Sequence, residues 1–195
     1  MILQEVLLAN RFFVREYDHR RARSMHHIPR KQVAVFTCMD TRLVEFLEPA
    51  LGLRRGDAKI IKNAGNRIHP GCDDVIRSLA AAVYLLEVKE ILVVGHYDCG
   101  MSMVPRELLI RRMLEHGIPR EEIAKIDPVE WIGGFTDTED NVREAVATIK
   151  NHPLFPAAIP VHGLLFDPDT GEVKVVVNGY ETGRKGLPGA VTESA

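Results

Sequence analysis

The chain has 195 residues, of which 46% are hydrophobic and 27% are charged, a balance typical of a globular protein with a sizeable core. Its formal net charge of −2 argues against a nucleic-acid-binding protein. No stretch approaches the roughly 20 apolar residues of a membrane-spanning helix, and the N-terminal residues lack the charged start and cleavage site of a signal peptide.

The three cysteines also indicate a cellular compartment. Cys38, Cys72 and Cys99 are odd in number and widely spaced, so they do not form a disulfide framework. We therefore expect a reducing, cytoplasmic location for this protein.

The first half of the chain alternates helical and strand patterns. Apolar residues at helical spacing over residues 4–23 predict a helix within an N-terminal arm of about residues 1–28. Short runs rich in β-branched residues then predict buried strands, and amphipathic segments predict helices between them. The expected strands are 32–38, 58–65 and 90–96, and the expected helices are 44–53 and 72–88.

The second half predicts helices over 106–116, 120–126 and 137–151. Two apolar runs then flank the turn sequence DPDTG at residues 167–171, a pattern typical of a β-hairpin. The last segment, about residues 181–195, is polar and contains Gly and Pro, so we expect a loose C-terminal tail.

Strands that alternate with helices predict an α/β fold: a mostly parallel central sheet flanked by helices, with an antiparallel edge strand. No segment reads as a linker, so residues 1–195 are expected to form a single domain. In such sheets, ligands bind outside the carboxyl ends of the strands. Cys38 and His96 each lie at such an end, which predicts that their side chains meet at one rim.

Two short motifs carry residues suited to metal chemistry. The first, TCMDTRL at residues 37–43, holds Cys38, and the second, GHYDCGM at residues 95–101, holds His96 and Cys99. Two thiolates and one imidazole suit zinc and leave a fourth position open, which is the arrangement of a catalytic site. The alternatives are that the cysteines are ordinary buried residues, or that they form a closed structural site. A closed site normally uses paired cysteines two to four residues apart, which this chain lacks.

These motifs resemble those of the β-class carbonic anhydrases, in their small, compact branch. The resemblance rests on CMDTR, NAG and GHYDCGM, which complete the family's C-x-D-x-R and H-x-x-C motifs, and it extends from about residue 32 to residue 179. It implies that Zn²⁺ is bound by Cys38, His96 and Cys99, and that Asp40 and Arg42 form a dyad beside the metal. It also implies a homodimer or higher homo-oligomer, in which an N-terminal helix reaches across the partner.

The implied activity is that of a zinc lyase: reversible hydration of carbon dioxide to bicarbonate and a proton, with zinc-bound hydroxide as nucleophile. Two thiolates cancel the formal charge of Zn²⁺, so a neighbouring acceptor that orients the nucleophile would help. Asp40 can be that acceptor, or it can take the fourth zinc position and close the site. Arg42 can hold Asp40 away from the metal through a bidentate ion pair.

Two other functions remain open at this point. Relatives with the same zinc motifs hydrolyse carbon disulfide or carbonyl sulfide, and the chain could also be a zinc-binding regulatory module without turnover. The complete Asp40–Arg42 pair argues against the regulatory module, because a structural site has no need of it. The family branch more often has a second glycine where Asn66 stands, which bears on the shape of the NAGN loop.

Overall fold

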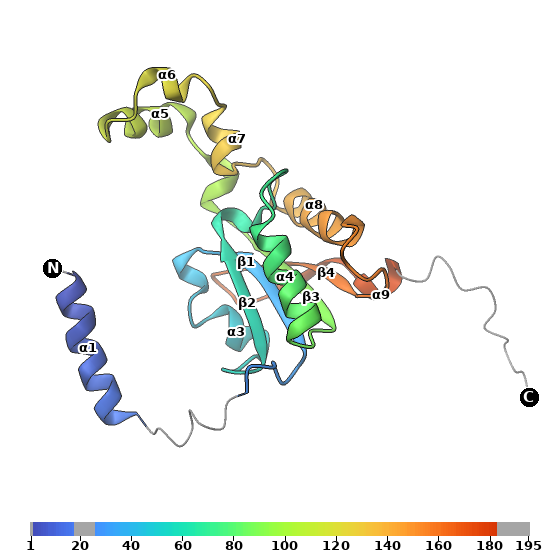
Figure 1. The fold of residues 1–195 in the computed structure, drawn as a ribbon. Coiled ribbons are helices and arrows are strands. Elements are labelled where there is room, and N and C mark those ends of the chain that lie inside the picture. Colours follow the sequence, from blue (N-terminus) through green and yellow to red (C-terminus); the bar gives the residue numbers. More distant parts are fainter. Residues whose placement is uncertain (1, 18–25, 183–195) are drawn as a thin grey trace, which may run out of the picture.

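The structure is a computed structural model that describes residues 2–17 and 26–182 (Figure 1). Its strands are β1 (Val33–Cys38), β2 (Ala58–Asn63), β3 (Glu90–His96), β4 (Val161–Phe166) and β5 (Val173–Val177). Its α-helices are α1 (Ile2–Glu16), α3 (Leu47–Ala50), α4 (Asp74–Leu85), α5 (Arg106–Glu115), α6 (Arg120–Ile123), α7 (Pro128–Ile132), α8 (Thr138–Asn151) and α9 (Gly179–Thr182). Three short 3-10 helices complete it: η1 (Thr41–Leu43), η2 (Ala64–Asn66) and η3 (Gly100–Met103).

The five strands form one sheet in the order β2-β1-β3-β4-β5. The first three pairs in this order are parallel, and β5 runs antiparallel to β4 at the edge. This confirms the predicted α/β class and the antiparallel edge strand. Because β1 and β3 are parallel neighbours, their carboxyl ends meet at the same rim of the sheet.

The sheet is covered on both faces, which explains the nearly continuous apolar runs of β1 and β3. Ala34 and Phe36 of β1 face a core shared with α4 and α8. Val33 and Val35 alternate to the other face, where they pack in a second core with Leu47 of α3. Figure 1 shows α4 and α8 beside the sheet and α3 on its other side.

The boundary of one predicted helix is wrong. Instead of a helix over residues 44–53, the structure has the four-residue α3. Glu45 adopts a left-handed φ of +57°, which a helix cannot contain, and Gly52 ends the segment with a φ of +65°.

The predicted helix over residues 4–23 is seen as α1, which ends at Glu16. Residues 18–25, and the predicted tail beyond residue 182, lie outside the described part of the chain. No residue of α1 is buried, and Figure 1 shows this helix apart from the sheet. Within the described ranges, no helix is both long and apolar enough to cross a membrane.

Candidate metal centre

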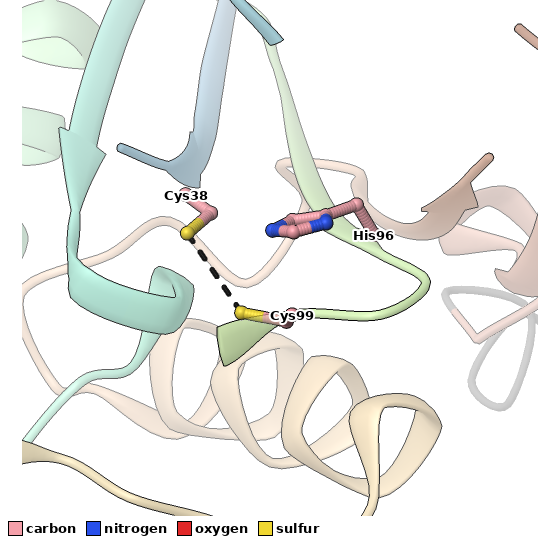
Figure 2. A group of neighbouring side chains, drawn as sticks. All are labelled: Cys38, His96 and Cys99. Atoms are coloured by element: carbon pink, nitrogen blue, oxygen red, sulfur yellow. Dashed lines mark hydrogen bonds between the residues drawn. The ribbon is translucent and has the colours of Figure 1, made fainter. Parts of the chain in front are cut away.

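Three potential metal ligands meet at the carboxyl rim of the sheet. Cys38 is the last residue of β1, His96 is the last residue of β3, and Cys99 follows in the next turn. Figure 2 shows the three side chains directed toward one another. All three are buried, and their ligand atoms lie within 4.8 Å of one another. The two sulfur atoms are 3.9 Å apart.

The surroundings of His96 fit a bound cation. Its Nδ1 donates to the carbonyl oxygen of Tyr97 at 2.8 Å, which leaves the lone pair on Nε2. That Nε2 is buried and has no hydrogen-bond partner among the residues the structure describes. Metal-binding histidines commonly have this arrangement, in which one ring N–H donates to a carbonyl and the other nitrogen is free to coordinate. One imidazole and two sulfurs are a donor set that suits Zn²⁺.

The two thiols have pKa values that are shifted in opposite directions. The Cys99 side chain hydrogen-bonds the Cys38 sulfur and lowers the pKa of Cys38 well below the usual thiol range. The same contact, together with burial, raises the pKa of Cys99. Thiolates are the forms that bind metal, so a divalent cation at this site has to displace the remaining proton from Cys99.

The NAGN loop supports the cluster from one side. The backbone N–H of Gly65 donates to the Cys38 sulfur at 3.3 Å, and Asn141 of α8 donates to the Gly65 carbonyl at 2.9 Å. Gly65 has a φ of +67°, and a Cβ there would lie 2.8 Å from the Phe135 ring. Asn66 also takes a left-handed φ, of +46°, so it adopts the kind of conformation that a second glycine would adopt.

Asp40 and Arg42 lie beside the cluster and bind each other in a fork. The Arg42 Nε and Nη2 atoms donate to Asp40 Oδ1 at 3.1 Å and Oδ2 at 3.0 Å. The Arg42 backbone N–H also donates to Oδ1, at 2.9 Å. These hydrogen bonds hold the pKa of Asp40 below its usual value. Asp40 Oδ2 is 3.8 Å from His96 Nε2, so the carboxylate is within reach of the atoms that would bind a metal.

Some neighbours of the site were not predicted from the sequence. Asn141 lies 76 residues from the glycine it supports, and no local pattern relates the two. Asp98 contacts Arg42. The only sequence feature that pointed to Asp98 was its position between His96 and Cys99. Cys72, which matched no ligand motif, is exposed and lies outside the cluster.

Comparisons with known proteins agree on one family. The family model described as carbonic anhydrase matches residues 33–173. The chain is 40% identical over 184 residues to the Bacillus subtilis (strain 168) protein named "Putative carbonic anhydrase YtiB", covering 92% of this chain and 98% of that one. It is 28% identical over 158 residues to carbon disulfide hydrolase of Acidithiobacillus thiooxidans, covering 74% and 76% of the two chains.

A solved structure shows the same architecture. The crystal structure of β-carbonic anhydrase isoform I from Trichomonas vaginalis is similar to this chain with a TM-score of 0.83 and 40% sequence identity, covering 91% of this chain and 98% of that one. The sheet order, the Cys-His-Cys cluster and these matches agree with one another. The chain therefore belongs to the β-class carbonic anhydrase family, which has carbon disulfide hydrolases among its relatives.

Proposed function

We propose that the chain binds one Zn²⁺ through Cys38, His96 and Cys99 and catalyses the reversible hydration of carbon dioxide to bicarbonate and a proton. The observation that carries this proposal is the buried His96 Nε2, which lacks a hydrogen-bond partner among the described residues and faces two buried sulfurs. Buried side-chain nitrogens nearly always have a hydrogen-bond partner, so a buried nitrogen without one calls for another partner, such as a metal ion.

Zn²⁺ held by these three residues would supply a Lewis acid and would activate a water molecule as the nucleophile. The protein's own contribution begins with the cluster, which fixes three ligand atoms on the ends of two neighbouring strands. Burial of these atoms excludes bulk water and strengthens their electrostatic interactions. The Gly65 N–H hydrogen bond stabilises the thiolate form of Cys38.

Asp40 has two possible roles at this site, and Arg42 selects between them. As a hydrogen-bond acceptor near His96 Nε2, the carboxylate can orient the attacking nucleophile. As a fourth ligand, it would close the site. The forked hydrogen bonds from Arg42 engage both Asp40 oxygens, so they favour the acceptor role.

A second substrate class has support from the relatives. Carbon disulfide hydrolases match this chain at about the level of the more distant carbonic anhydrases, so hydrolysis of carbon disulfide or carbonyl sulfide at the same site is the alternative. The two functions separate in one experiment on zinc-loaded protein. Stopped-flow hydration of carbon dioxide and sulfide release from the two sulfur substrates are measured on the same sample. Fast hydration with little sulfide release supports the proposal, and the reverse supports the alternative.

The proposal includes an assembly and a compartment. The apolar side chains of α1 are exposed in the single chain, so a second copy of the chain is the proposed cover for them. The thiols of Cys38 and Cys99 must stay reduced to bind zinc, which agrees with a reducing, cytoplasmic location.

A further inference from the structure

Arg42 has a second acidic partner besides Asp40. Its Nη1 donates to Asp98 Oδ2 at 2.9 Å, and its Nη2 donates to the Asp98 backbone carbonyl at 2.7 Å. All three guanidinium nitrogens are therefore engaged, with one side of the group on Asp40 and the other on Asp98. Contacts on two sides restrict the orientation of the planar guanidinium more than the Asp40 fork does alone.

The contact also joins the two segments that follow β1 and β3. Arg42 lies in the segment after β1, four residues beyond Cys38, and Asp98 lies immediately before Cys99. The Arg42–Asp98 ion pair therefore spans from one strand end to the next, on the exposed side of the site.

The backbone at Asp98 indicates that its side chain is there for a reason other than packing. Asp98 has a left-handed φ of +52°, which a glycine adopts without steric cost. Its side chain is 90% exposed, so it fills no part of a core. An aspartate tolerates this conformation better than most residues do, and it adds a carboxylate that glycine lacks.

We propose that Asp98 is a positioning residue, which holds Arg42 in the orientation that keeps both oxygens of Asp40 engaged and so keeps Asp40 off the fourth metal position. This inference rests on the proposed zinc function. Since the pair is exposed, its effect should be modest. Loss of the Asp98 side-chain contact with Arg42 should raise the ratio of closed to open sites by about two- to five-fold, the scale of an exposed ion pair.

The test is the affinity of an inorganic anion for the metal. The protein is loaded with Co²⁺, and thiocyanate is titrated while the visible spectrum of the metal is recorded. If Asp40 occupies the fourth position more often, thiocyanate must displace it, and its apparent Kd rises. The variants are Asp98→Gly, which relieves the backbone strain and removes the carboxylate, and Asp98→Asn, which removes the charge but keeps an acceptor for Arg42.

A positioning role and a simple charge effect predict opposite changes in the thiocyanate Kd of Asp98→Gly. Removal of a negative charge beside the site by itself favours anion binding and lowers the thiocyanate Kd. We expect Asp98→Gly to raise the Kd, against this charge effect and by at most about five-fold, and Asp98→Asn to leave it at or below the wild-type value. A Kd for Asp98→Gly equal to or below the wild-type Kd would overturn the proposal.

A matched control separates backbone strain from positioning. Glu87 is exposed, has a φ of +57° and lies just before β3, at the opposite end of that strand from His96. Glu87→Gly should relieve a similar strain and leave the thiocyanate Kd unchanged. A rise in Kd for Glu87→Gly like that for Asp98→Gly would assign the effect to backbone strain and overturn the proposal.

A second measurement does not need the metal. Rotation about the Cζ–Nε bond of Arg42, followed by NMR in the zinc-free protein, should be faster in Asp98→Gly than in the wild type and in Asp98→Asn. An equal rate in all three would reject the positioning role. If the wild type fails to bind Co²⁺ or zinc, the proposed function fails, and the NMR result still decides whether Asp98 holds Arg42.

Discussion

Asp40 and Arg42 are the residues whose exchange tests the proposed chemistry most directly. Arg42→Ala removes the fork from Asp40, so we expect the zinc content to be kept while the hydration rate falls, since Asp40 is free to close the site. Asp40→Asn removes this competitor but leaves a poorer acceptor, and a loss of about 100-fold is the scale of a missing acid–base partner. Full activity of both variants between about pH 6 and pH 9 would mean that the dyad is only a structural ion pair.

The pH dependence of zinc binding follows from the ligands. Burial opposes a charge on His96, but the neighbouring Cys38 sulfur and the Tyr97 carbonyl outweigh it, so the pKa of His96 is raised. A proton therefore competes for Nε2 at a higher pH than in a free histidine, and the zinc affinity should fall as the pH falls through this raised pKa. Asp40 has a lowered pKa and stays ionised over the same range.

Competition with a chelator of known zinc affinity, from about pH 8 down to pH 5.5, measures this fall. The zinc affinity can only fall as the pH falls, because protonation of His96, Cys38 or Cys99 always competes with metal binding. A constant affinity across this range would show that His96 is not a ligand.

Gly65 is required for steric reasons. An alanine Cβ there would lie 2.8 Å from the Phe135 ring and 2.9 Å from Met101 Cβ, at a φ of +67°. We expect Gly65→Ala to destabilise the fold by about 1–3 kcal/mol, the range for overpacking, and to weaken zinc binding through the Cys38 sulfur. Thermal unfolding measures the first effect and the chelator competition the second.

Gly100→Ala is the matched control for this variant. A Cβ at Gly100 meets nothing within 4 Å, and its φ is not left-handed, so the substitution should cost little stability. Equal unfolding temperatures for Gly65→Ala and Gly100→Ala would contradict the steric argument.

At the scale of elements, the strands were the most predictable. The predicted and observed bounds of β3 agree at residues 90–96, because a run of apolar residues between charged and glycine-containing segments has few alternatives. Helix ends were less predictable, as the short α3 shows. The helix α7 was not predicted, although Asp127 and Pro128 are a known start signal. In the structure, the Asp127 side chain accepts hydrogen bonds from Val129 and Glu130 N–H groups.

The helix α1 gives a prediction about assembly. Its residues Val6, Leu7 and Phe13 are 54%, 49% and 60% exposed, which is costly for apolar side chains in water. If a second copy covers them, Leu7→Asp should weaken the assembly and lower the mass measured by light scattering at micromolar concentration. A wild-type mass near the 21.9 kDa of one chain would rule out the proposed oligomer.

For the whole molecule, the sequence allowed the fold class and the meeting of Cys38 with His96 at one rim to be predicted. The fold class follows from the alternation of strands and helices, and the meeting follows from the rule that ligands bind outside the carboxyl ends of parallel strands. The order of the strands, the support of Gly65 by Asn141 and the contact of Asp98 with Arg42 could not be predicted. Each depends on residues that are distant in the chain and are brought together only by packing.

The central claim is that zinc at Cys38, His96 and Cys99 makes this chain a carbonic anhydrase. Zinc is titrated into metal-free protein, and the rate of carbon dioxide hydration is followed by stopped flow at each addition, for the wild type and for Cys99→Ala. The account predicts a wild-type rate that rises with zinc and levels off at one equivalent per chain, and no such rise in Cys99→Ala. Hydration at full rate without zinc, or a wild-type chain that binds one equivalent and does not hydrate carbon dioxide, would contradict it.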